Sequence, residues 1–499
     1  MFYPQYTWLI VVGSLGAFGF GWGTGANDVA NAFGTSVGAK SLTLKQAVVL
    51  ATIFEFTGAL VLGRVSTDTI AGGIADISYF KSNPTVYAYG MCCTLLVGFL
   101  WQAIASYNEW NVSSTHSIIG GIIGFAMTYK GAKGVNWMIS DTSGTSFPPV
   151  KGVIPIVISW FISPILTGMA SALIFLLSRT LVLRRQNSYQ LSFYTIPFLV
   201  LLTTWINIYF VFTKGAKKSL QSEDDWSDSK AGWIALIIAV GTSILSTLVG
   251  IPLLKRRVEK HQQVMVQTLQ ETEDGTLTIP SPQTNLESEN TSKKTWKEML
   301  LQGVEADIHK VIDENPLVHE IHANAEVFDP KTEIVYQYLQ IFSAICVIFA
   351  HGAGEVGYMA GPLGTIWSVV NDGKLDKKLV PPIWVILIGA FGLVVGLATY
   401  GYNVTRAVGT KLAKISPSRG FAAELATALI ILLSSQYGLP TSSSQCITGA
   451  IVGIGMMEGM KGVNWQLFAT TFASWVGTMV VMGVGVSALF AQGIYAPHS

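Results

Sequence analysis

Long apolar runs alternate with short polar segments along almost the whole chain. A helix that spans a membrane needs about 20 mostly apolar residues, and eight runs meet this length. They lie at 7–38, 46–63, 152–179, 191–213, 230–256, 335–371, 382–402 and 466–492. The pattern predicts an all-α fold, that of a polytopic membrane protein.

Two further apolar stretches are interrupted near their middles. Residues 85–129 contain a polar break at 106–117, and residues 420–459 contain one at 434–445. Each stretch is either two full spans or a re-entrant helical hairpin, because irregular backbone at membrane depth must line protein or water. With the eight long runs, this gives about 12 membrane segments.

The segment 257–333 differs from the rest of the chain. It holds 15 of the 30 acidic residues but only 7 of the 31 basic ones. Its middle, 271–290, is rich in Ser, Thr, Pro and Glu, a composition typical of disorder. Its later part, 296–313, has apolar residues at helical spacing and predicts a surface amphipathic helix. We expect a partly disordered cytoplasmic loop.

The chain also contains an internal repeat. Three motifs of the first half recur in the second at offsets of 329, 328 and 327 residues. The pairs are Asn111–Gly124 with Pro440–Gly453, Lys133–Trp137 with Lys461–Trp465, and Gly25–Asn31 with Gly352–Tyr358. Chance similarity of apolar helices would not keep three motifs so nearly in register.

Arg and Lys clusters indicate how the repeats are oriented. Placing 257–333 in the cytoplasm puts the clusters at 179–185, 255–257 and 406–419 on the same side, as the positive-inside rule requires. Both termini then lie outside, and the two hairpins enter from opposite faces. This arrangement is an inverted-topology repeat, which is common in secondary transporters. The predicted units are 1–180 (first inverted repeat), 181–256 (additional membrane helices), 257–333 (loop) and 334–499 (second inverted repeat).

Composition narrows the class of function. Only 12% of the residues are charged, about half of the 25% of an average soluble protein, which argues against a soluble enzyme. The 31 basic and 30 acidic residues leave no basic excess for nucleic acid. No Walker-type phosphate loop and no cysteine cluster with metal spacing is present. We expect a transporter without a cofactor.

One acidic motif interrupts the first apolar run. A carboxylate within a membrane span is costly unless it is paired or solvated, so Asp28 is a functional candidate. Together with the Asn27 amide and carbonyl groups of a glycine-loosened turn, it offers the oxygen ligands that suit a hard cation such as sodium. The alternative is an Asn/Asp cap on a helix that ends there.

Hydroxyl side chains precede a Gly-rich helix in each interrupted stretch. Hydroxyls and free N–H groups at a helix N-terminus bind anions, so the two ends together predict a clamp for one tetrahedral oxyanion. Ordinary capping of two helices is the alternative for either end alone. The candidates are Ser113, Ser114 and Thr115 in the first half and Ser442, Ser443 and Ser444 in the second.

Other polar residues lie in or near the apolar runs. The carboxylates of Glu55, Glu355 and Glu424 fit either cation ligation or hydrogen bonding between helices. His116 and His351 fit structural hydrogen bonds better than a proton relay. Gln102 fits either a polar lining of the first hairpin or plain packing.

At these residues the chain resembles the inorganic phosphate transporter (PiT) family of sodium-coupled symporters. The resemblance covers nearly all of the chain except 257–333. It is carried by Gly25–Asn31, Trp101–Ser106 leading into Val112–His116, Phe349–Gly352 with Gly361 and Pro362, and Glu424 followed by Leu439–Ser444.

The resemblance implies a dimeric transporter that binds phosphate between the Ser/Thr turns of the two hairpins. It implies sodium, as a co-substrate, near Asn27 and Asp28 and their second-half counterpart. Glu55 and Glu424 match acids that the family needs for transport. The second half departs from the family's pattern, with Gly354, Glu355 and Tyr358 where Asn, Asp and a later Asn are usual. Gln445 also replaces a usual His.

We therefore expect a plasma-membrane symporter that carries inorganic phosphate with sodium by alternating access and forms a homodimer. The departures leave sodium and proton coupling both open. The alternatives are a proton-coupled phosphate permease, a sulfate permease of the same fold, and a nutrient sensor that binds phosphate and signals through 257–333.

Overall fold

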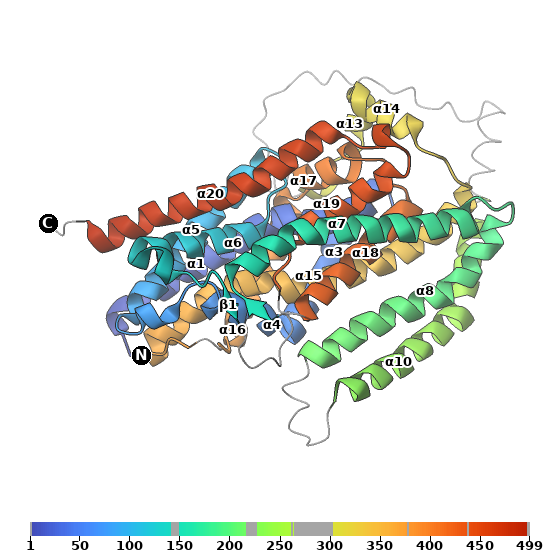
Figure 1. Cartoon of the computed structure of the whole chain (residues 1–499). Coiled ribbons are helices and arrows are strands. Elements are labelled where there is room, and N and C mark those ends of the chain that lie inside the picture. The colour runs from blue at the N-terminus through green and yellow to red at the C-terminus, as the bar shows by residue number, and fades with distance from the viewer. Residues whose placement is uncertain are drawn as a thin grey trace.

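The chain folds into a bundle of long helices that run roughly along one axis (Figure 1). The computed structural model describes residues 2–140, 149–215, 227–260, 263, 303–376, 379–436 and 439–496. Within these ranges, ten helices are long and apolar enough to cross a membrane. The prediction of a helical, polytopic membrane protein is confirmed. The ten are Pro4–Gly38, Leu44–Leu62, Pro84–Tyr107, Val153–Leu183, Ser188–Thr213, Asp228–Lys260, Pro330–Asp372, Ile383–Tyr400, Pro417–Ser434 and Trp465–Tyr495.

The elements follow the apolar runs closely. The first half contains α1 (Thr7–Thr24), α2 (Ala30–Gly38), α3 (Leu44–Leu62), α4 (Arg64–Gly72), α5 (Pro84–Tyr107), α6 (Ser114–Lys130), β1 (Ile139–Ser140), β2 (Val150–Lys151), α7 (Val153–Ser178), α8 (Ser188–Phe210) and α10 (Asp228–Leu245). The second half contains α13 (Lys310–Glu314), α14 (Pro316–Asn324), α15 (Pro330–Asp372), α16 (Ile383–Tyr400), α17 (Tyr402–Arg406), α18 (Pro417–Gln436), α19 (Ser443–Met456) and α20 (Trp465–Tyr495). The two short strands pair antiparallel, with Ile139 opposite Lys151.

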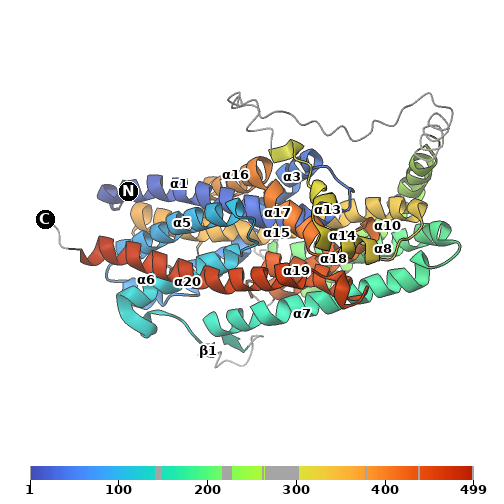
Figure 2. The same cartoon turned by 90° about the horizontal axis from the view of Figure 1, so that it is seen from above.

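The 43-residue helix α15 forms the centre of the bundle. It packs against α1, α3, α4, α5, α16 and α18, and Figures 1 and 2 show it surrounded by other helices. The outer helices α7, α8, α10 and α20 instead expose large apolar side chains, among them Met169, Phe198, Trp233 and Val484. An apolar outer surface over a more polar centre is what a bilayer requires.

Two pairs of helices form hairpins within the bundle. In the first, α5 and α6 are joined by residues 108–113; in the second, α18 and α19 are joined by residues 437–442. Their open ends lie at opposite ends of the molecule (Figure 1). The start of α5 lies beside the end of α20, where the Tyr89 hydroxyl donates to the Leu489 carbonyl. The base of the second hairpin is closed by an ion pair between Arg419 and Glu458.

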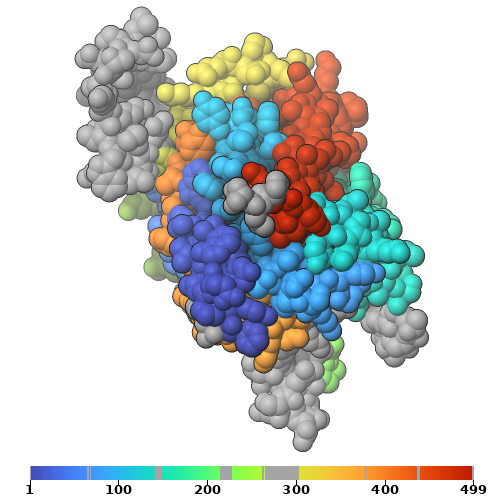
Figure 3. Space-filling model, turned by 90° about the vertical axis from the view of Figure 1, so that its left-hand side faces the viewer, coloured from blue at the N-terminus to red at the C-terminus, as the bar shows by residue number. Residues whose placement is uncertain are grey.

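Both chain termini lie at the end of the molecule where the first hairpin opens (Figure 1). Figure 3 looks onto this end, with N-terminal residues in blue and C-terminal residues in red. The N–H of Phe2 donates to the carbonyls of Val370 and Asn371 at the end of α15, which ties the N-terminus to the central helix.

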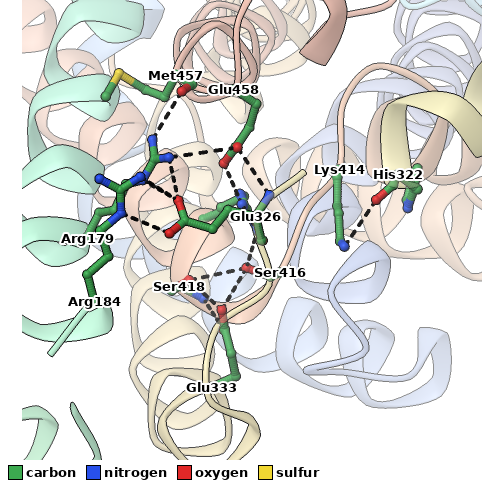
Figure 4. Close-up of polar contacts among 11 residues, drawn as sticks. Arg179, Arg184, His322, Glu326, Glu333, Lys414, Ser416, Ser418, Met457 and Glu458 are labelled. Atoms are coloured by element: carbon green, nitrogen blue, oxygen red, sulfur yellow. Dashed lines mark hydrogen bonds and ion pairs between the residues drawn. The ribbon is translucent and has the colours of Figure 1, made fainter. Parts of the chain in front are cut away.

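The end of the 257–333 segment docks on the base of the second hairpin (Figure 4). Glu326 accepts hydrogen bonds from Arg179 at 2.7 Å and from Arg184 at 2.9 Å, just past the end of α7. Arg419 of α18 donates to the Glu326 carbonyl at 2.9 Å and pairs with Glu458 at 2.6 Å. This network connects α7, α18 and α19 to the short segment that leads into α15.

The helix predicted over 296–313 is wrong over 306–309. Residues 303–305 are helical, the chain then leaves the helix, and α13 begins at Lys310. The Asp307 side chain accepts a hydrogen bond from the N–H of His309 at 2.9 Å, a local turn that competes with helix. Residues 271–290 and 296–302 lie outside the described part of the chain.

Candidate functional site

The first acidic motif lies in a change of helix geometry rather than a full break. Residues Gly25–Val29 form a π-helical turn between α1 and α2. Gly25 is required there, because a Cβ at this position would lie 1.9 Å from the Leu393 carbonyl of α16. A π turn alters the backbone hydrogen bonding locally and is often found at functional sites.

The turn places Asn27 and Asp28 against the turn of the first hairpin. The N–H of Val112 donates to Asn27 Oδ1 at 3.1 Å, and Asn27 Nδ2 donates to the Trp110 carbonyl at 2.8 Å. The N–H of Ser114 donates to Asp28 Oδ2 at 3.0 Å. The motif therefore binds the backbone of the hairpin turn, and Asp28 does not cap its own helix.

Several buried oxygens near this turn are left without a donor. No described residue donates to Asp28 Oδ1, Asn31 Oδ1 or Gln102 Oε1, and the nearby Thr24 Oγ1 also has no hydrogen-bond partner there. Buried polar atoms are normally paired, so this group is unusual. Thr24 lies one turn before Asp28 and was missed in the sequence, where a threonine near a helix end carries no distinct signal.

In each of the two hydroxyl clusters, one residue caps a helix and the next contacts another part of the molecule. Ser113 caps α6 by accepting from the N–H of His116, and Ser442 caps α19 by accepting from the N–H of Gln445. Ser444 bonds to the Ser442 hydroxyl at 2.9 Å. The capping alternative thus describes the first residue of each cluster, and the next residue of each points elsewhere.

Those next residues meet at one carboxylate. The Ser114 hydroxyl donates to Glu355 Oε2, and the Ser443 hydroxyl donates to Glu355 Oε1 at 2.9 Å. Glu355 is buried in the middle of α15. One side chain therefore joins the turns of both hairpins.

A second buried acid lies close to this junction. Glu55 of α3 and His351 of α15 form a hydrogen bond of 2.9 Å between Oε1 and Nδ1, and His351 Nε2 lies 3.9 Å from Glu355 Oε1. The sequence analysis favoured a structural role for His351, whereas the structure places its ring between the carboxylates of Glu55 and Glu355. The contact with Glu55 could not be predicted, because the two residues are 296 positions apart in the sequence.

Glu424 is buried elsewhere and does not reach the hairpin turns. Four side chains donate to its carboxylate: Thr35 at 2.7 Å, Ser36 at 2.6 Å, Gln340 at 3.1 Å and Ser343 at 2.6 Å. These donors come from α2 and α15, whereas Glu424 lies on α18. The acid thus joins the second hairpin to two other helices.

Repeat-related residues meet across the interface of the two halves. His116 Nε2 and Gln445 Nε2, which are equivalent in the repeat, lie 3.4 Å apart. Asn111 accepts from Asn31 at 2.7 Å and donates to Thr448 at 3.2 Å. This polar layer of Asn31, Asn111 and Thr448 was not predicted from the sequence. Residues 111 and 448 both lie in the repeated segments, which is the signal that could have identified them.

The remaining candidates are also buried. Gln102 Nε2 donates to the Ser117 hydroxyl at 3.4 Å, and Thr115 donates to the Tyr358 hydroxyl at 3.0 Å. A cavity of about 50 Å³ lies beside Glu355 and Ser443, enough for a few water molecules. Of the predicted residues, Asp28, Ser114, Glu355 and Ser443 lie together; Glu424 lies apart.

Comparison with known proteins agrees with this architecture. The model of a family described as the phosphate transporter family matches residues 24–485. The phosphate-repressible phosphate permease pho-4 of Neurospora crassa is 30% identical over 99% of this chain and 98% of its own. The sodium-dependent phosphate transporter of Plasmodium falciparum is 25% identical over 99% of this chain and 98% of its own.

A solved structure described as the sodium-dependent phosphate transporter has the same fold. Its TM-score is 0.74 at 26% identity, and the match covers 98% of this chain and 100% of that one. The resemblance seen in the motifs is confirmed. The chain is therefore an integral membrane protein that belongs to the phosphate transporter family.

Proposed function

We propose that the chain carries inorganic phosphate across a membrane together with sodium, by alternating access. The observation that carries this proposal is the meeting of two Ser-bearing helix N-termini, one from each half, at one buried position. Hydroxyls and N–H groups at helix N-termini favour anions. A tetrahedral oxyanion has enough acceptor oxygens to be held by both turns at once.

In this proposal the phosphate seat is formed by both hairpin turns and by Gln102 of α5. The seat is central, between the two halves, where many secondary transporters bind their substrates. The proposed phosphate-binding residues are Ser113, Ser114, Thr115, Ser442, Ser443, Ser444 and Gln102.

Sodium would bind beside the π turn. The proposed ligands are Asn27 and Asp28, with Glu355 and Glu55 from the neighbouring helices. Since no three His, Cys, Asp or Glu side chains group as metal ligands in the described part of the chain, the three acids would not all bind one ion in this conformation. Amide, hydroxyl and carbonyl oxygens would complete the shell. The unpaired oxygens of Thr24, Asp28 and Gln102 support this position. Glu424 would act in transport without binding either substrate.

We also propose the finer architecture that the sequence predicted. The ten long helices together with α6 and α19 make 12 membrane segments, with α5–α6 and α18–α19 as re-entrant hairpins of two inverted repeats. The opposite directions of the hairpins support this (Figure 1). The units remain 1–180, 181–256, 257–333 and 334–499, in a plasma-membrane homodimer with both termini outside and the 257–333 loop in the cytoplasm.

Initial rates of labelled-phosphate uptake into liposomes containing the purified protein test the substrate and the ion. We expect uptake that requires external sodium, falls to background in choline, and is not competed by excess sulfate. Uptake driven equally by a proton gradient without sodium would identify a proton-coupled permease. Strong sulfate competition would identify a sulfate permease. Binding without net flux would identify a sensor.

A further inference from the structure

The carboxylate of Glu355 occupies the place where the two hairpin turns converge. Each of its oxygens accepts a hydrogen bond from a different half, Oε2 from Ser114 and Oε1 from Ser443. Both hydroxyls belong to the proposed phosphate seat. A carboxylate and a phosphate present the same kind of group, an anionic oxygen, to the same donors.

The repeat shows that this crossing is specific to the second half. Asp28 is the counterpart of Glu355, at an offset of 327 residues. Asp28 takes the backbone N–H of Ser114 in its own half, whereas Glu355 contacts Ser443 in its own half and Ser114 in the other. Glutamate is one methylene longer than aspartate, and the extra length gives it the reach to bridge both turns.

Another residue of α15, Tyr358, also contacts a hydroxyl of the first hairpin. Tyr358, one turn beyond Glu355, accepts a hydrogen bond from Thr115 at 3.0 Å. Its counterpart in the first half is Asn31, which bonds to Asn111. The two side chains of α15 that break the repeated motif are therefore the two that contact the hydroxyls of the first hairpin.

Two anions compete for one buried set of donors. Phosphate cannot take the Ser114 and Ser443 hydroxyls while Glu355 holds them, and two negative charges close together in a buried site repel strongly. We propose, on the basis of the proposed function, that Glu355 is a tethered competitor of phosphate. It holds the two hairpin turns together and weakens phosphate binding, which sets the affinity of the transporter.

Equilibrium binding of labelled phosphate to purified protein at saturating sodium tests this. Glu355→Gln keeps the size of the side chain and removes its charge, and we expect the Kd for phosphate to fall roughly tenfold or more. Glu355→Asp keeps the charge and loses the reach, so its Kd should also fall, by a smaller factor. A Kd that is unchanged or higher in both variants would overturn the proposal.

Glu333→Gln is the matched control. Glu333 lies on the same helix and also accepts from two serine hydroxyls, Ser416 at 3.0 Å and Ser418 at 2.7 Å, but it is far from the hairpin turns. Its substitution should leave the Kd unchanged. Sodium affinity, measured in the same samples, separates a lost sodium ligand from a lost competitor.

A small free carboxylate gives a second readout that a merely structural role would not produce. In Glu355→Ala, added formate should refill the emptied position and raise the apparent Kd for phosphate, while the wild type should not respond. Absence of any formate effect in the variant would contradict occupation of the phosphate seat. Failure of the wild type to bind or carry phosphate would instead overturn the proposed function.

Discussion

Two buried acids, Asp28 and Glu355, contact the hairpin turns at the centre of the molecule. Asp28 holds the backbone of the first turn, and Glu355 collects the hydroxyls of Ser114 and Ser443. None of these contacts joins residues close in sequence, so each one depends on the whole bundle. Single substitutions here should change transport more than stability.

Asp28→Asn should abolish sodium-dependent uptake of labelled phosphate in liposomes. The amide keeps the size of the side chain but removes the charge that would attract sodium, and one oxygen of the carboxylate has no hydrogen-bond donor among the described residues. The matched control is Asp76→Asn, since Asp76 also accepts a backbone N–H, that of Ser78 at 3.0 Å, away from the site. Near-normal uptake in Asp28→Asn would refute its assignment.

Glu424→Gln should separate transport from binding. Four donors converge on the carboxylate, and an amide would turn a donor toward some of them, a mismatch of about 1–3 kcal/mol. Because Glu424 lies away from the proposed phosphate seat, the Kd for phosphate should stay within roughly threefold, while the maximal uptake rate falls on the order of tenfold. A raised Kd with a normal maximal uptake rate would place Glu424 in the phosphate seat instead.

At the scale of elements, the sequence predicted the long helices well and the contacts between them poorly. Runs of apolar residues locate a span directly, so α3, α7, α16 and α20 begin and end within a few residues of their predicted limits. The π turn at Gly25–Val29 was not predicted in this form, because it depends on how Gly25 packs against the Leu393 carbonyl.

For the candidate site too, the sequence predicted the residues but not their contacts. The repeat and the polar breaks pointed to the residues of both hairpin turns, since a hydroxyl or an acid in an apolar run is conspicuous. The sequence did not show which of these side chains contact one another. The contact of Glu55 with His351 and the four donors around Glu424 join residues that are distant in sequence, and only the packed helices bring them together.

Docking of the segment that contains Glu326 is an element-scale feature that can be tested alone. Glu326→Gln should raise amide hydrogen exchange in α14, because the neutral amide removes the charge that Arg179 and Arg184 share and keeps only one of the two acceptor oxygens (Figure 4). The control is Glu320→Gln, whose carboxylate lies 3.7 Å from exposed Lys461. Equal exchange in both variants would show that the Glu326 contacts do not hold the segment.

The same contacts should not respond to pH in the physiological range. Hydrogen bonds from Arg184 and Arg179 lower the pKa of Glu326 below its ordinary value of 4.5. A lowered folded-state pKa gives stability that is present above the unfolded-state value and lost as pH falls through the folded one. Exchange in α14 should therefore be constant from pH 6 to 8, after correction for the intrinsic rate.

At the scale of the whole molecule, the proposed coupling predicts how transport responds to membrane potential. Carrying an anion into a negative-inside vesicle is opposed by roughly 2.3 kcal/mol per charge per 100 mV. Two sodium ions with one singly charged phosphate would reverse that sign. A potassium diffusion potential, negative inside, should therefore accelerate sodium-dependent uptake, and slower uptake would contradict this stoichiometry.

The central claim, that sodium drives phosphate through this protein, is tested most directly by concentrative uptake. Liposomes with the purified protein, equal phosphate on both sides and sodium only outside should accumulate labelled phosphate above its external concentration. Collapse of the sodium gradient should then release it. Phosphate that only equilibrates, or that accumulates equally when choline replaces sodium, would contradict the account.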